Sequence, residues 1–105
     1  MNHGAEADFL ERSGAALAAI EQALDAAGLD VERVGDGILE LECDDGSKIV
    51  VNRHTAAREI WVAARSGGFH FRPDGERWVD TRSGETLQDK LSALIAMQAG
   101  VRVAL

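Results

Sequence analysis

The spacing of hydrophobic residues changes twice along this chain. Residues 5–27 place apolar side chains at intervals of three and four, which predicts an amphipathic helix that can end at Gly28. Helical spacing returns over residues 86–98, where Thr86 can cap a second helix and Gly100 can end it. Between the two helices the interval falls to two, which predicts short strands near 30–34, 38–43, 47–53, 58–65, 68–72 and 77–80.

Short glycine-containing turns separate the predicted strands, at residues 35–37, 44–46, 66–68 and 73–75. Connections this short make neighbouring strands antiparallel. Each helix carries one apolar stripe, and one face of the sheet is the only large apolar surface that could cover both stripes. The sequence therefore predicts a single α+β domain over residues 1–105. It is a two-layer sandwich, with two terminal helices packed on one face of a five- to six-stranded antiparallel sheet.

Trp61 stands out within the segment REIWVAAR, residues 58–65. Ile60 and Val62 flank it and suit the covered face of the sheet, so Trp61 is expected on the open face. The same alternation puts Asn52 and His54 of the preceding strand on that face, and strand pairing brings Asn52 near Trp61. An exposed aromatic side chain beside polar groups is typical of a protein-binding hot spot. The sequence therefore predicts a partner contact at Asn52, His54 and Trp61.

Acidic residues are concentrated in the first part of the chain, and the formal net charge is −7. Residues 1–45 hold 12 acids against two bases, whereas residues 46–105 hold six acids against nine bases. The acidic segment would repel phosphate, so nucleic acid is not an expected partner. A cation or a basic protein surface is favoured instead, although acids also serve to keep a small domain soluble.

The composition is that of an ordinary soluble protein, with 46% hydrophobic and 28% charged residues. No apolar run approaches the roughly 20 residues that span a bilayer, and the acidic N-terminal segment does not resemble a signal peptide. The single cysteine, Cys43, cannot form an intrachain disulfide and is expected to be a buried thiol. We therefore expect a cytoplasmic protein without membrane contact, and nothing in the sequence demands more than a monomer.

Glu21 and Asp25 are four residues apart, so they share one face of the predicted first helix. Like charges at this spacing destabilise a helix by about 0.2–0.5 kcal/mol. Their presence favours a cation or a basic partner at this face, and a plain solvated surface is the alternative. Carboxylates suit hard ions such as iron, magnesium, calcium and manganese, and the absence of thiol or imidazole ligands nearby predicts an open, weak site.

No pattern typical of an enzyme occurs in the sequence. There is no Ser-His-Asp order, no glycine-rich phosphate loop and no HExxH motif. Carboxylates on an exposed helix also lack the burial that raises a pKa for acid–base catalysis. We therefore do not expect an enzyme.

Several of these segments together resemble the frataxin family, and most closely its bacterial branch. The resemblance is carried by DDGSKIVVNRHTAAREIWVAARSGGFHF, followed by RWVDTRSGETLQDKL. It extends over nearly the whole chain and is densest from Asp36 to Leu91. The short elements GSKI, VNR, IW, SGG and SGET are weak singly and specific in combination.

This resemblance implies two parallel helices on one face of an antiparallel sheet and a role in iron–sulfur cluster assembly. It implies docking on a cysteine desulfurase and its scaffold protein, with Trp61 and Asn52 in the positions of the family's exposed sheet residues. His54 stands where the family usually has glutamine. The resemblance also implies weak surface binding of ferrous or ferric iron through an acidic ridge that includes Glu21 and Asp25, which could also contact the partner. The implied metal ligands are Glu21, Asp25, Asp30 and Glu32.

The ridge is thinner than the family pattern, because Ala26 and Ala27 occupy positions where acids would be expected. Two hypotheses follow. The protein is an iron-binding regulator whose docking depends on the metal, or it is an acidic protein-interaction module whose iron binding is incidental.

Overall fold

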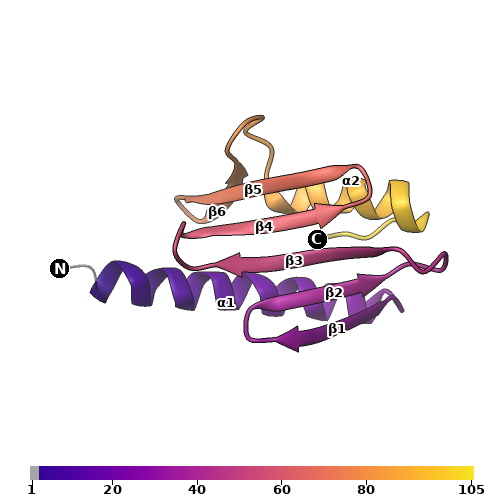
Figure 1. The fold of residues 1–105 in the computed structure, drawn as a ribbon, viewed down its shortest axis with the longest axis horizontal. Helices are drawn as coiled ribbons and strands as arrows, with labels where there is room; N and C mark the ends of the chain where they lie inside the picture. The colour runs from indigo at the N-terminus through magenta and orange to yellow at the C-terminus, as the bar shows by residue number, and fades with distance from the viewer. Residues whose placement is uncertain (1–2) are drawn as a thin grey trace.

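The structure is a computed structural model that describes the backbone of residues 3–105 and the side chains of residues 4–105. Along the sequence, one helix precedes six strands and a second helix follows them (Figure 1). The elements are α1 (His3–Ala26), β1 (Asp30–Gly35), β2 (Ile38–Glu42), β3 (Lys48–His54), β4 (Glu59–Ala64), β5 (Gly67–Asp74), β6 (Arg77–Asp80) and α2 (Leu87–Ala99). The predicted order of elements is confirmed, and their ends differ from the prediction by at most two residues.

The six strands form one sheet in sequence order, and every neighbouring pair is antiparallel. Two predicted turns are shorter than expected. Gly67 and Gly68 belong to β5, because they pair with Ala64 and Ala63 of β4. Pro73 also belongs to β5, where it pairs with Trp78. The predicted α+β sandwich with a five- to six-stranded antiparallel sheet is confirmed.

Both helices lie behind the same face of the sheet and run in the same direction (Figure 1). The hydroxyl oxygen of Thr86 accepts a hydrogen bond from the backbone N–H of Asp89, 3.2 Å away, and caps the start of α2. Gly100 ends that helix in the left-handed conformation with φ +71°. Both ends of α2 therefore match the signals in the sequence.

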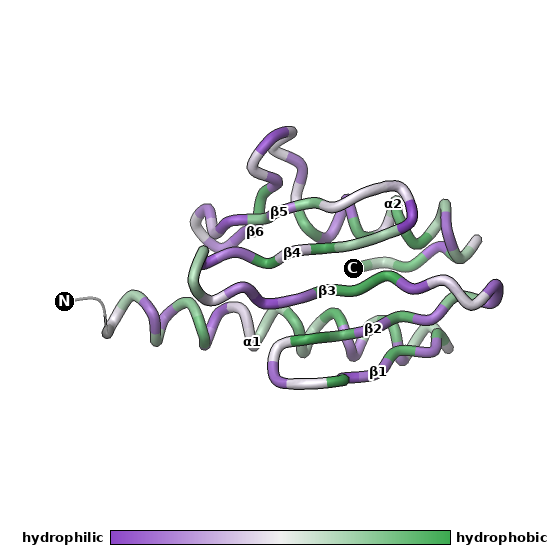
Figure 2. Tube along the Cα trace, in the orientation of Figure 1, coloured by the Kyte–Doolittle hydropathy of each residue, from purple (hydrophilic) through white to green (hydrophobic). Residues whose placement is uncertain are grey.

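The hydrophobic core fills the space between the helices and the sheet. Hydrophobic segments alternate with hydrophilic ones along the strands and along both helices (Figure 2). Phe9 and Trp78 meet edge to face within this core, with ring centroids 5.9 Å apart, and Cys43 is buried as expected. The C-terminal tail returns between the two helices (Figure 1), and its Val101, Val103 and Leu105 pack against the core.

The side chain of Arg53, on β3, joins the sheet to α1. This side chain is only 12% exposed, and its Nε donates a hydrogen bond to the hydroxyl of the fully buried Ser13, 2.9 Å away. The guanidinium also lies 3.5 Å from the carboxylate of Asp36. This contact fixes the β1–β2 turn against the first helix.

One face of the sheet is thus covered by helices, and the other face is open. Within residues 3–105, neither helix has the length and hydropathy needed to cross a bilayer. The open face, the edge strand β1 and helix α1 carry the residues that the sequence marks as candidates for function.

Candidate functional site: an aromatic stack and an acidic edge

Strand register assembles a row of side chains across the open face. Asn52 of β3 pairs with Trp61 of β4, and Trp61 pairs in turn with His70 of β5. Ile38 of β2 stands opposite Asn52 and extends the row. The predicted proximity of Asn52 and Trp61 is therefore confirmed.

Trp61 is sandwiched between two imidazole rings. The His54 ring lies on one side, with centroids 3.8 Å apart and planes 10° apart. The His70 ring lies on the other side, at 4.4 Å and 12°. These cross-strand contacts leave Trp61 half-buried rather than freely exposed. Strand alternation predicts His70 on the open face, but its stacking on Trp61 depends on the pairing of β4 with β5, which no local pattern shows.

Glu59 fixes the stack from one side. Its carboxylate oxygen Oε1 accepts a hydrogen bond from the Trp61 indole nitrogen at 2.8 Å and lies 3.4 Å from Nδ1 of His70. Nδ1 of His54 accepts a 3.3 Å hydrogen bond from the backbone N–H of Ala57 in the following turn. The Trp61 and His54 rings are therefore held by hydrogen bonds as well as by stacking, and the His70 ring lies close to the Glu59 carboxylate. This order reduces the entropy lost if a partner binds here.

A shallow hollow of about 210 Å³ opens beside this stack. Ala63 and Gly68 pair across its floor, and both have small or absent side chains. Trp61, Asn52 and His70 form its polar and aromatic side. The lining is Val50, Asn52, Trp61, Val62, Ala63, Gly68, Phe69 and His70.

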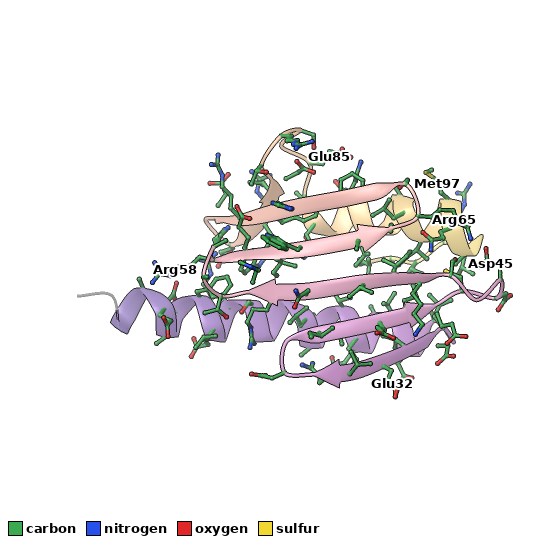
Figure 3. All side chains as sticks on the ribbon, in the orientation of Figure 1. Glu32, Asp45, Arg58, Arg65, Glu85 and Met97 are labelled. Carbon is green, nitrogen blue, oxygen red and sulfur yellow. The ribbon has the colours of Figure 1, made fainter. Side chains whose placement is uncertain are left out.

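The four predicted metal ligands lie near one end of α1 and on β1, and Glu21 of α1 does not face Glu32 of β1. Glu21 of α1 accepts a 2.9 Å hydrogen bond from Arg33 of β1 and is paired with that guanidinium. Arg33 therefore points toward the helix layer. Glu32 precedes Arg33 and points to the opposite face, because successive strand residues alternate. Strand β1 thus separates Glu21 from Glu32, which lies at the free edge of the sheet (Figure 3).

The open face near β1 and β2 has its own charged cluster. Glu32 pairs across strands with Glu40, whose carboxylate lies 3.0 Å from the ammonium group of Lys48. The hydrogen bond and charge of Glu40, together with the charges of Glu42 and Glu32, raise the pKa of Lys48. Three carboxylates therefore surround one ammonium group, and this corner of the open face remains acidic.

The described side chains do not form a ready-made metal site. Within residues 4–105, no group of three or more His, Cys, Asp or Glu side chains is placed to hold a metal ion. In addition, the guanidinium of Arg33 binds Oε1 of Glu21 and offsets the charge of that carboxylate. The geometry thus fits loose attraction of cations better than a preformed coordination sphere.

The chain is similar to proteins of one known family over nearly all its length. Residues 3–101 match the model of the frataxin-like domain. The chain is 54% identical to the iron-sulfur cluster assembly protein CyaY of Cupriavidus pinatubonensis, over 90% of this chain and 89% of the relative.

Solved structures agree with this assignment. The frataxin of Psychromonas ingrahamii superimposes with a TM-score of 0.86 at 26% identity, covering 93% of this chain and 94% of that one. A trimeric frataxin of the yeast Saccharomyces cerevisiae, complexed with ferrous iron, gives a TM-score of 0.64 at 26% identity, with coverage of 91% and 86%. The chain is therefore a member of the frataxin-like family.

Proposed function

We propose that this protein takes part in iron–sulfur cluster assembly as a non-enzymatic regulator or adaptor that docks on a cysteine desulfurase and its scaffold protein. The role is supported by a relative of 54% identity that is named an iron-sulfur cluster assembly protein. The observation that carries the docking proposal is the ordered His54–Trp61–His70 stack on the open sheet face. A soluble domain has no structural need for a tryptophan there, and binding surfaces are enriched in this residue.

Docking would use two surfaces with different tasks. The acidic residues of α1 and β1, including Glu21 and Asp25, attract a basic partner and accelerate the encounter. The open-face group Asn52, His54 and Trp61 then supplies contact area and slows dissociation. Affinity should accordingly fall with rising salt concentration, while the contribution of Trp61 should depend little on salt.

Iron would bind weakly near Glu21, Asp25, Asp30 and Glu32. Hard carboxylate ligands support this assignment, and a yeast relative is complexed with ferrous iron. The Glu21–Arg33 pair favours the alternative, an acidic interaction module whose iron binding is incidental, because the guanidinium binds Oε1 of Glu21 and its positive charge repels a cation there.

The docking proposal is tested by replacing Trp61 with alanine. Affinity for the purified desulfurase–scaffold complex from the same genome, measured by calorimetry, is expected to fall about 30-fold, as for a hot-spot residue of roughly 2 kcal/mol. Met97→Ala is the matched control, because Met97 is 74% exposed and lies on α2, in the helix layer away from the open face. It should leave affinity unchanged.

Two results would contradict the docking proposal. Unchanged affinity of Trp61→Ala would remove the open face from the interface. A loss of stability of about 3–5 kcal/mol would show that Trp61 acts as a core residue, whereas loss of each of the two stacking contacts should cost only about 0.5–1.5 kcal/mol.

Arg33 provides a test of the iron site. Arg33→Gln frees the Glu21 carboxylate, so it should strengthen binding of ferrous iron in anaerobic NMR titrations if Glu21 is a ligand. Signals of Glu21, Asp25, Asp30 and Glu32 should then broaden at lower iron concentration than in the original chain. Arg72→Gln on the open face serves as a charge-matched control. Unchanged titrations in Arg33→Gln, together with desulfurase binding that iron does not alter, would favour the adaptor with incidental iron binding.

A further inference from the structure

The hollow beside Trp61 exists because two positions on its floor lack large side chains. Gly67 adopts φ +148°, a backbone conformation that favours glycine. Gly68 has no such conformation, and a Cβ added there would meet only the carbonyl oxygen of Val62 at 4.0 Å. The fold therefore needs a glycine at 67 but not at 68. The missing side chain at Gly68 leaves the open face concave next to Ala63.

The size and lining of the hollow suit a single apolar side chain. Its volume is about 210 Å³, and a cavity of roughly 150 Å³ lined by apolar groups holds a benzene molecule. Val50 and Ala63 form apolar surface at its base, while the Trp61 ring is held in place by the two imidazoles and by Glu59. A wall that is already ordered favours insertion of a partner side chain.

Acidic side chains lie on one side of the hollow, beyond Val50. Val50, on its floor, pairs across strands with Glu40, and Glu40 pairs with Glu32. With strands spaced by about 4.8 Å, the acidic corner begins one strand from Val50 and roughly 10 Å from Ala63. Lys48 offsets only one of the three carboxylates of that corner, Glu32, Glu40 and Glu42. A partner side chain above this corner should therefore be basic.

Resting on the proposed docking function, we propose that the hollow is the specificity pocket of the open face. It receives one aliphatic side chain from an extended loop of the partner protein. The same loop carries a lysine or arginine two residues away, because residues i and i+2 of an extended segment face the same side. Two extended residues span roughly 7 Å, and the long side chain of the basic residue covers the remaining distance to Glu40 and Glu32.

The pocket can be filled without disturbing the fold. Gly68→Val and Ala63→Leu each add apolar atoms to an exposed strand position, and valine suits a strand better than glycine. Each variant should melt at or above the temperature of the original chain. Ala93→Leu is the matched control, because Ala93 is exposed on α2 in the helix layer.

Calorimetric titration of the purified desulfurase–scaffold complex with these variants tests the proposal. Both pocket variants are expected to lose at least tenfold in affinity, with Ala93→Leu unchanged. Glu32→Gln combined with Glu42→Gln is expected to weaken binding and to make it less sensitive to salt. Together these results would support the pocket and its basic neighbour.

Two other outcomes overturn the proposal and are distinguishable from each other. If the original chain binds and both filled variants bind equally well, the pocket is not used, while the docking function stands. If the original chain does not bind the complex at all, the docking function fails and the pocket proposal fails with it.

Discussion

Replacing Gly37 with alanine should destabilise this protein much more than the same replacement at Gly46. Both glycines lie in hairpin turns and have nearly equal backbone angles, φ +81° and φ +85°. A Cβ added at Gly37 would lie 2.9 Å from Cβ of Arg53, whereas a Cβ at Gly46 would meet nothing within 4 Å. The comparison therefore separates backbone strain from close packing.

The expected difference in unfolding free energy between the two variants is what remains after the cost that both variants share. Each places an L-residue in the left-handed region at about 1–2 kcal/mol, partly offset by about 0.4–1 kcal/mol of lost freedom in the unfolded chain. Only at Gly37 must a neighbour also move. Arg53 resists this movement, because its backbone N–H donates a hydrogen bond to the Gly37 carbonyl at 2.7 Å and its Nε donates one to the Ser13 hydroxyl. Such overpacking costs about 1–3 kcal/mol, which is the expected difference between the two variants.

The measurement is urea unfolding of both variants, followed by tryptophan fluorescence and far-ultraviolet circular dichroism. The Gly37 variant should unfold at lower urea, with a melting temperature lower than that of the Gly46 variant by about 4–8 °C for each kcal/mol. Gly28→Ala is a second control, because Gly28 has φ +79° and no atom within 4 Å of an added Cβ. Equal losses in all three variants would refute the close contact with Arg53.

Two further predictions concern acid stability and the C-terminal tail. A hydrogen bond from the Ser47 hydroxyl and the Arg65 guanidinium hold the pKa of Asp45 well below its usual value. A depressed folded-state pKa adds stability above the unfolded value of about 4, and this contribution is lost as the pH falls below it. The Asp45→Asn variant should therefore lose less unfolding free energy than the original chain between about pH 4 and pH 2. Identical dependence of unfolding free energy on pH in the two proteins would contradict this. Deleting the last three residues removes half-buried Val103, whose carbonyl accepts a 3.1 Å hydrogen bond from the Ser92 hydroxyl. Calorimetry should show a loss of unfolding free energy of about 2 kcal/mol. An unchanged melting temperature would exclude a structural role for the tail.

The pattern of residues was sufficient for the fold and for the face on which each candidate lies. Strand alternation around Trp61 placed it opposite the covered Ile60 and Val62, and turns of a few residues left only antiparallel neighbours. Those rules are local, since a strand residue points to one face or the other whatever its partners are. The placement of Asn52, Trp61 and His54 on the open face followed from them.

Contacts between strands and between layers could not be read from the sequence in the same way. The stacking of Trp61 between His54 and His70 depends on the register of three strands and on ring orientations set by Glu59 and a turn N–H. No local rule fixes these, because each ring orientation depends on neighbours from other strands.

The acidic residues show the same limit. Glu21 and Glu32 are close in sequence and were expected to form one surface, yet β1 lies between them and Arg33 is paired with Glu21. Which carboxylates face one another depends on how the helix packs against the edge strand. Spacing along the chain determines the face of each element, whereas side-chain partners are chosen by the packing of elements that are distant in sequence.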